Sequence, residues 1–284
     1  MAAQEPTGVR CGRSFSTYPD LFDRALRASR GLHELGIGGG DRVALLLRNS
    51  LEFLEASIAT VPLGASAVPV NWHWRGDEIA HVLSDSGAKA LVVHADLWPA
   101  IAPSVPDGVA LIVVPTPAGP IGDPPAGALL WPRWLASNQP WAQAPETGPV
   151  SIIYTSGTTG RPKGVVRAQA TASQREQTQA ILGEIFKLAP EERTVIPAPM
   201  YHAAPNVYAL AASKLVMIVM SMPRIAAASA YTLGAAWYIG AGITVRSSGA
   251  SWKISPSTAC ICSRWDSAAC ARTTPFGRPV VPEV

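Results

Sequence analysis

Cysteine is scarce in this chain, with four residues in 284. Three of them, at 260, 262 and 270, lie near the C-terminus at spacings that fit no standard zinc pattern. Only Cys11 lies elsewhere, so a disulfide framework is excluded and a reducing compartment is indicated. We therefore expect a cytoplasmic protein with no bound metal.

Charge is also sparse, at 15% of residues, and the net charge is only +3. Such a small excess, without a basic cluster, argues against nucleic acid as a partner. The first 20 residues contain no apolar core of a signal peptide. A hydrophobic content of 48% fits a folded globular body rather than disorder.

What the chain does have is alternation of apolar strands with helical stripes. The pattern predicts helices over 20–35, 51–63 and 77–86, the first capped by Asp20 and the third near Gly76, with strands over 43–47, 67–70, 90–94 and 110–114. Such alternation predicts an α/β fold, with mainly parallel sheets flanked by helices. Residues 115–149, rich in Pro, Gly and Ala, are interpreted as a long loop, and 174–186 as a helix with a polar start.

The most informative segment follows a short β-branched run, 150–154, that predicts a strand. Its glycines allow close approach of backbone N–H groups to an anion, its hydroxyls add donors, and its lysine adds a point charge. The segment therefore indicates a phosphate-binding loop formed by Thr155, Ser156, Gly157, Thr158, Thr159, Gly160 and Lys163. The spacing of a Walker A loop is absent. The alternative is a solvated Gly/Thr turn. It is disfavoured because ten residues of the segment, directly after a strand, fit the phosphate-binding pattern.

With this loop, Tyr154-Thr-Ser-Gly-Thr-Thr-Gly-Arg-Pro-Lys-Gly164, the chain resembles the AMP-forming acyl-CoA synthetases of the adenylate-forming superfamily. Further stretches carry the resemblance. Downstream it is Pro197-Ala-Pro-Met-Tyr-His-Ala-Ala-Pro205, and upstream they are Leu35-Gly-Ile-Gly-Gly-Gly-Asp-Arg-Val-Ala44 and Leu63-Gly-Ala-Ser-Ala-Val-Pro-Val-Asn71. The resemblance covers about residues 14–222, the N-terminal part of such an enzyme. A peptide-synthetase adenylation domain is the neighbouring alternative, which the Met200-Tyr-His202 stretch disfavours.

The resemblance implies a two-step ligation. A small-molecule carboxylate attacks the α-phosphate of ATP to give an acyl-adenylate, and the thiol of CoA then displaces AMP. ATP and Mg²⁺ are implied as cofactors and CoA as co-substrate. The loop would hold the β- and γ-phosphates, and Tyr201 and His202 would lie at the acyl pocket. For His202, a packed side chain without a functional role is an equal alternative.

The C-terminal tail mirrors the loop at the level of codons. Read on the opposite strand, one base out of frame, a Val codon gives Thr, Glu gives Ser, Pro gives Gly, and Phe gives Lys or Asn. Residues 284 back to 275 thus return Thr-Ser-Gly-Thr-Thr-Gly-Arg-Pro-Lys-Gly, the sequence of 155–164. Each position pairs with 439 minus its number, and only five of the 58 positions in 227–284 do not fit. We interpret this segment as encoded antisense to the codons for 155–212.

These patterns divide the chain into an N-terminal extension (1–13), a truncated adenylation domain (14–222) and a non-native, irregular tail (223–284). The family's adenine, ribose and magnesium motifs and its lid with the catalytic lysine are not found, so we expect an inactive fragment of an acyl-CoA ligase. One alternative is a non-functional pseudogene or assembly product with no activity. Another is a membrane-anchored protein using the uncharged residues 225–243, which the antisense origin of that run disfavours.

The tail makes a prediction about the gene. We expect an inverted repeat in the coding DNA, with codons 227–284 complementary, one base out of register, to those for 155–212. Sequencing the coding DNA tests this directly. Two segments without reverse complementarity would show that the interpretation of the tail is wrong.

Overall fold

The computed structural model describes residues 7–116, 125–143, 151–155, 161–167, 193–212, 217–220, 243–248 and 251–256, and the isolated positions 171, 173, 177 and 180. Three predictions lie largely or wholly outside these residues: the loop segment 156–160, the helix over 174–186 and the uncharged run 225–243. Within the described part of the chain, no helix is long and apolar enough to cross a membrane.

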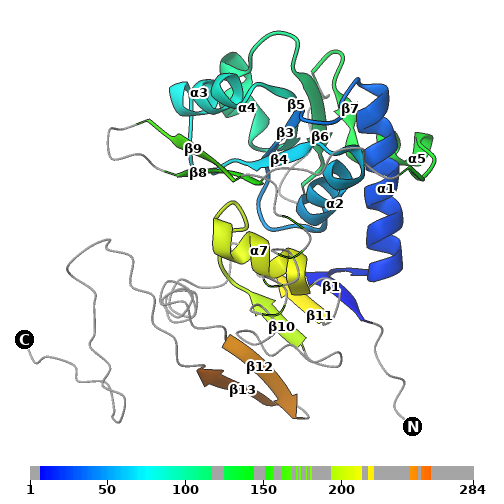
Figure 1. Ribbon diagram of the computed structural model, residues 1–284, viewed down its shortest axis with the longest axis vertical. Coiled ribbons are helices and arrows are strands. Elements are labelled where there is room, and N and C mark those ends of the chain that lie inside the picture. The colour runs from blue at the N-terminus through cyan, green and yellow to red at the C-terminus, as the bar shows by residue number, and fades with distance from the viewer. Residues whose placement is uncertain are drawn as a thin grey trace, which may run out of the picture.

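A five-stranded parallel sheet forms the upper half of the molecule (Figure 1). Its strands lie in the order β4-β3-β5-β6-β7, and every neighbouring pair is parallel. Their bounds are β3 Arg42–Leu46, β4 Ser66–Pro69, β5 Ala88–His94, β6 Ala110–Val114 and β7 Leu129–Leu130. The predicted α/β fold with a mainly parallel sheet is confirmed, and the four predicted strands lie within two residues of their observed ends.

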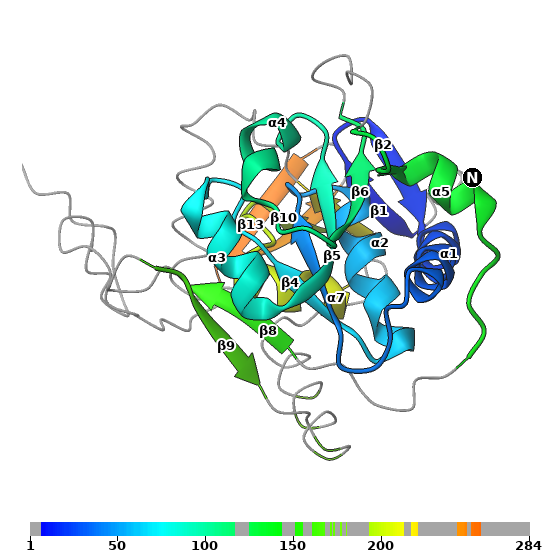
Figure 2. The ribbon, with the colours of Figure 1, turned by 90° about the horizontal axis from the view of Figure 1, so that it is seen from above.

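Helices cover both faces of this sheet (Figure 2). Successive side chains of a strand point to opposite faces. In β3, Val43 and Leu45 therefore pack with α1 Tyr18–Glu34, α2 Leu51–Thr60 and α5 Trp131–Ser137, and α2 continues into the short turn η1 Val61–Leu63. Ala44 and Leu46 pack with α3 Asp77–Ser86 and α4 Trp98–Ile101, which continues into η2 Ala102–Ser104. Burial on both faces explains why the strands are continuously apolar.

Two local predictions are wrong. The first helix is capped by Thr17, whose side chain accepts a hydrogen bond from the backbone N–H of Asp20 at 3.2 Å. Asp20 lies in the first turn, where a carboxylate favours the positive end of the helix dipole. The segment 115–149 is not one loop, because β7 and α5 lie within it. Pro132 stands in the first turn of α5, where proline starts a helix rather than breaking it.

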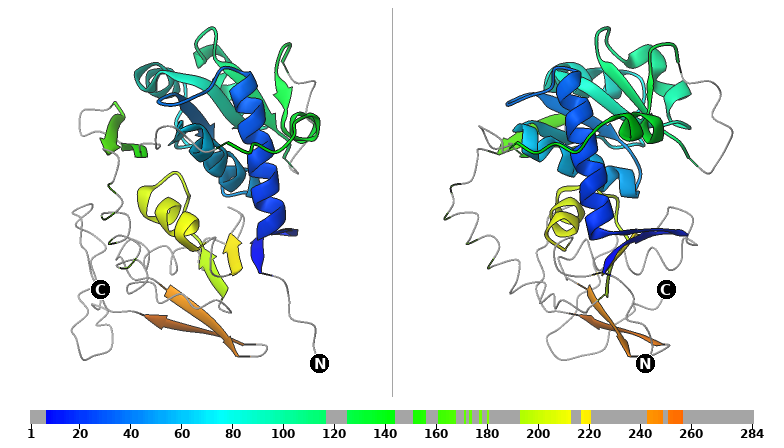
Figure 3. Two further views of the ribbon diagram at one scale, coloured as in Figure 1. Left: turned by 45° about the vertical axis from the view of Figure 1, so that its right-hand side comes forward. Right: turned by 90° about the vertical axis from the view of Figure 1, so that its right-hand side faces the viewer.

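A second, four-stranded sheet lies below the first in the order β10-β11-β1-β2. It joins β1 Gly8–Cys11 and β2 Ser14–Thr17 to β10 Arg193–Ile196 and β11 Met217–Met220, with β1 parallel to β11 and antiparallel to β2. Helix α1 continues from β2 and runs up to the first sheet (Figure 3). One apolar cluster spans both sheets and includes Val9, Met220 and Tyr208 of α7 Ala203–Ala212.

Within the tail, the described residues form an antiparallel hairpin of β12 Ile243–Ser248 and β13 Ser251–Pro256. This hairpin is a sheet of its own and joins neither of the larger sheets. The predicted antisense origin of the tail would account for its first strand. On that prediction, residues 243–246, Ile-Thr-Val-Arg, would be the antisense partners of Arg193-Thr-Val-Ile196 in β10. Since antisense exchanges Val with Thr and returns Ile as Ile, a β-branched strand gives another β-branched strand.

The helices α1, α2 and α5, which cover one face of the first sheet, are joined by a buried carboxylate and by a close helix contact. Glu55 of α2 is fully buried and accepts hydrogen bonds from Arg24 at 2.6 and 3.1 Å and from Trp131 at 3.0 Å. The link thus joins α1, α2 and α5. Gly31 of α1 lies under Trp134 of α5, where an added Cβ would come within 2.3 Å of the indole.

We predict that Gly31→Ala destabilises the protein by about 1–3 kcal/mol, because the methyl group overpacks the α1–α5 contact. In an open helix the same change stabilises by about 0.5–1 kcal/mol, so the expected sign is reversed. Urea unfolding followed by tryptophan fluorescence measures the difference. Gly38→Ala is the matched control, since no atom lies within 4 Å of the place that a Cβ would take there, and it is expected to be near neutral. A stabilised Gly31→Ala variant would contradict the packing described.

Candidate phosphate-binding site

The candidate site is built on a hairpin of β8 Ser151–Thr155 and β9 Lys163–Arg167. The strands are antiparallel, and Thr155 lies directly opposite Lys163 at the end where the loop connects them. Both residues are exposed there. The structure therefore brings two of the predicted phosphate-binding residues together, while Ser156, Gly157, Thr158, Thr159 and Gly160 lie outside the described residues. The pairing strand β9 was not predicted from the sequence.

One glycine of the loop sequence is explained by packing. Gly164 lies opposite Tyr154 in the hairpin, and an added Cβ would come within 2.8 Å of the tyrosine ring. The ring of Tyr154 thus occupies the space that a side chain at Gly164 would need. This position requires glycine because of a cross-strand contact, and no positive φ is involved.

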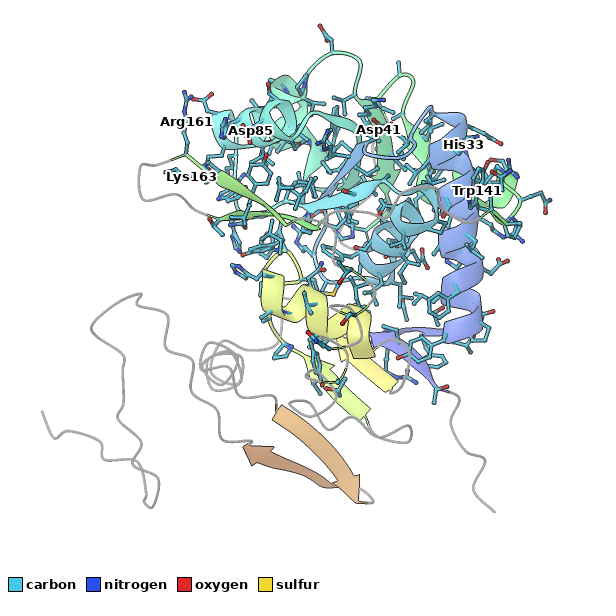
Figure 4. All side chains as sticks on the ribbon, in the orientation of Figure 1. His33, Asp41, Asp85, Trp141, Arg161 and Lys163 are labelled. Atoms are coloured by element: carbon cyan, nitrogen blue, oxygen red, sulfur yellow. The ribbon has the colours of Figure 1, made fainter. Side chains whose placement is uncertain are left out.

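The hairpin is docked against helix α3, and Figure 4 shows Asp85, Arg161 and Lys163 on this side of the molecule. Ile152 and Tyr154 belong to the same apolar cluster as Val82 and Leu83 of α3. The Tyr154 hydroxyl donates to Asp85 Oδ2 at 2.5 Å. Beside the other strand, His81 Nε2 donates to the carbonyl oxygen of Pro162 at 3.0 Å.

The segment 197–202, which ends in the two predicted acyl-pocket residues Tyr201 and His202, is held by Asn49 from the loop after β3. The amide of this buried side chain donates to the Ala198 carbonyl at 2.9 Å and accepts from the Met200 N–H at 2.8 Å. Asn206 of α7 donates to the Met200 carbonyl at 3.1 Å. The backbone leading to Tyr201 and His202 is therefore fixed from two sides.

Tyr201 and His202 form a tilted ring pair with centroids 4.4 Å apart. Tyr201 is buried, whereas His202 is exposed. Partial desolvation of the imidazole lowers the pKa of His202, and the nearby His73 lowers it further. The neutral form of His202 is thereby favoured near neutral pH, which suits a lining role better than a fixed charge.

A cluster that sequence reasoning missed lies where β3, β4 and β5 end. Arg48 donates to Asp96 at 2.9 Å, and its guanidinium lies 5.2 Å from the centroid of the Trp72 ring. Trp72 stacks on His73 with centroids 3.6 Å apart. The backbone N–H of Arg48 donates to Nδ1 of the buried His94 at 3.1 Å. The carboxyl ends of adjacent parallel strands lie at one edge of a sheet. This rule, applied to the predicted strands, could have indicated that these residues lie close together.

No metal centre is evident in the part of the chain that the structure describes, which contains no group of three or more His, Cys, Asp or Glu that could hold an ion. Lys163, the first residue of β9, is an exposed cation at the loop end of the hairpin.

The model of the AMP-binding enzyme family matches residues 4–232. The chain belongs to this family.

Named relatives agree with this assignment. The long-chain-fatty-acid–CoA ligase FadD13 of Mycobacterium tuberculosis is 32% identical over 219 residues, covering 76% of this chain and 42% of that protein. A feruloyl-CoA synthase of Amycolatopsis is 33% identical over 202 residues, covering 70% of this chain and 37% of that protein. The chain therefore spans less than half the length of these curated relatives.

Solved structures show the same fold. The N-terminal domain of FACL13 from Mycobacterium tuberculosis superposes with a TM-score of 0.65 at 29% identity, covering 80% of this chain and 56% of that one. The anthranilate CoA ligase AuaEII, in complex with anthranoyl-AMP, has a TM-score of 0.68 at 23% identity, covering 81% and 44%. The latter likeness concerns the fold alone.

His94 predicts a pH dependence of stability. Burial, helped by the charge of Arg48, lowers the pKa of His94 from 6.5 to about 4. The unfolded chain binds a proton at higher pH than the folded one does, so stability is retained above about pH 6.5 and falls toward pH 4. The loss amounts to up to about 3 kcal/mol. Urea unfolding across this range measures it.

The His94→Asn variant isolates this effect, because an amide oxygen can accept from the Arg48 N–H and does not titrate. We expect a flatter stability profile between pH 6.5 and 4 in this variant. An unchanged slope would show that other groups cause the acid sensitivity.

Proposed function

We propose that this chain is the N-terminal portion of an ATP-dependent acyl-CoA ligase. In the first step, a carboxylate oxygen attacks the α-phosphate of ATP, forming an acyl-adenylate and releasing pyrophosphate. In the second, the CoA thiol attacks the acyl carbon and AMP leaves. The observation that carries the proposal is the hairpin with Lys163 opposite Thr155, in a chain that matches the family over residues 4–232.

The proposed task of the hairpin is electrostatic. Negative charge shifts onto the leaving pyrophosphate as the P–O bond breaks, and a fixed cation at that point stabilises the transition state. Lys163 would supply the cation, and Thr155 would supply a hydroxyl donor on the facing strand. Together with Ser156, Gly157, Thr158, Thr159 and Gly160 they would surround the β- and γ-phosphates. Mg²⁺, when bound, would neutralise phosphate charge.

The proposed acyl side is the segment fixed by Asn49. Tyr201 and His202 follow Met200 directly, so the two backbone hydrogen bonds of Asn49 would set their position relative to the first sheet. We assign the acyl substrate only as a carboxylic acid, since the relatives are named for acids as different as a long-chain fatty acid and ferulate. CoA is proposed as co-substrate on the same family basis.

A second candidate is that residues 1–284 alone have no activity. It is favoured by the short span, which covers 42% of the FadD13 relative. The adenine and ribose motifs that the resemblance implies are not found in the sequence, and placement of reactants supplies roughly 7–11 kcal/mol of a barrier. We propose that the 284 residues bind nucleotide phosphates weakly and do not turn over on their own.

We predict that the purified chain releases no pyrophosphate from ATP with any carboxylate, with or without CoA. A chimera that continues after Met222 with the C-terminal portion of a CoA ligase should restore turnover. In that chimera Lys163→Ala should lower the rate by about 10²–10³-fold, because it removes a preorganised charge. A coupled pyrophosphate-release assay measures both.

The matched control is Lys89→Ala, which removes an exposed lysine that is paired with Asp41 and lies outside the hairpin, and it should leave the rate unchanged. Acyl-adenylate formation by the unmodified chain, lost on Lys163→Ala, would contradict the proposed inactivity. A chimera insensitive to Lys163→Ala would contradict the role of the hairpin.

A further inference from the structure

Helix α3 carries none of the motif residues, yet it makes side-chain hydrogen bonds to the hairpin at two points. Asp85 accepts from Tyr154 on β8 at 2.5 Å, and His81 donates to the carbonyl of Pro162, next to β9, at 3.0 Å. Residues four apart lie on the same face of a helix, so both side chains point from one face of α3 to the hairpin. The two bonds restrain both arms of the hairpin.

The two attachment points adjoin the residues that would meet phosphate. Tyr154 directly precedes Thr155, and Pro162 directly precedes Lys163. Because Thr155 and Lys163 face one another across the hairpin, the two bonds hold its loop end from both strands. A shift of the hairpin relative to α3 would therefore move both phosphate-facing side chains together.

The Tyr154–Asp85 bond is suited to this task by its charge. Burial, with the neighbouring Asp85 carboxylate, raises the pKa of the Tyr154 phenol above its ordinary value. The phenol therefore stays protonated and donates to a charged acceptor, which makes a stronger bond than a neutral pair does. Asp85 itself is exposed, so its loss leaves no cavity in the core.

We propose that Asp85 is a positioning residue for the phosphate-binding hairpin, acting through Tyr154, and that His81 secures the second strand through Pro162. The hairpin part of this inference stands on the contacts alone. Its consequence for nucleotide binding rests on the proposed function.

The test uses the full 284-residue chain and four variants: Asp85→Ala, Asp85→Asn, Tyr154→Phe and Asp85→Ala/Tyr154→Phe. Asp85→Asn keeps an oxygen that accepts from the phenol, and Tyr154→Phe keeps the ring beside Gly164. Asp77→Ala is the matched control, since it removes an exposed carboxylate from the first turn of the same helix that makes no hydrogen bond to the described residues of the hairpin. Amide hydrogen exchange of the peptide covering 151–167, affinity for Mg·ATP by titration calorimetry, and urea unfolding are measured for each.

We expect faster exchange in the 151–167 peptide for Asp85→Ala and Tyr154→Phe, with Asp85→Asn close to the wild type. Affinity for Mg·ATP should fall about fivefold in the same two variants, the equivalent of one lost hydrogen bond, and no further in the double variant. Global stability should change no more than in Asp77→Ala. A merely stabilising role would move the unfolding curve without this selective pattern.

Hairpin exchange in Asp85→Ala equal to that in Asp77→Ala would overturn the proposal. Failure of the proposed function looks different: the wild type would show no binding of Mg·ATP, while hairpin exchange would still respond to Asp85→Ala and recover in Asp85→Asn. That outcome would support the anchoring and refute its link to a nucleotide.

Discussion

The parallel five-stranded sheet needs apolar cover on both faces, and the rest of the molecule follows from that need. Alternate residues of β3, β5 and β6 point to opposite sides, so α1, α2 and α5 must cover one face and α3 and α4 the other. The connections between parallel strands then place every strand's carboxyl end on one edge. Arg48, Trp72, His94 and Asp96 meet at that edge for this reason, and Asn49 reaches the segment before Tyr201 from the same place.

The cover of the second face also serves the candidate site. Val82 and Leu83 of α3 are buried with Ile152 and Tyr154, so the helix that closes the sheet is also the platform for the hairpin. Its polar side chains Asp85 and His81 then fix the hairpin at the residues next to Thr155 and Lys163. A single packing requirement thus connects the sheet to the position of Thr155 and Lys163.

Much of this architecture was predictable because local patterns determine it. Strands β3, β4, β5 and β6 follow from short apolar runs, and helix α3 from its stripe and the glycine before it. Three features were missed because each depends on partners supplied by the fold. They are the cap at Thr17, the helix α5 with its proline in the first turn, and the strand β9. For the site, the loop motif identified Thr155 and Lys163, but Asn49 lies 149 and 151 residues from the backbone groups it binds, and Asp85 lies 69 residues from Tyr154. Single-sequence patterns carry no signal for contacts so distant.

The proposed function requires that the hairpin binds the phosphates of a nucleotide. The most direct test is ³¹P NMR of ATP titrated with the full chain, which resolves the α-, β- and γ-phosphates separately. The account predicts that the β and γ resonances broaden or shift with the wild-type chain, and that Lys163→Ala abolishes the effect while Lys89→Ala does not. Unperturbed β and γ resonances with the wild type, or equal perturbation with Lys163→Ala, would contradict it.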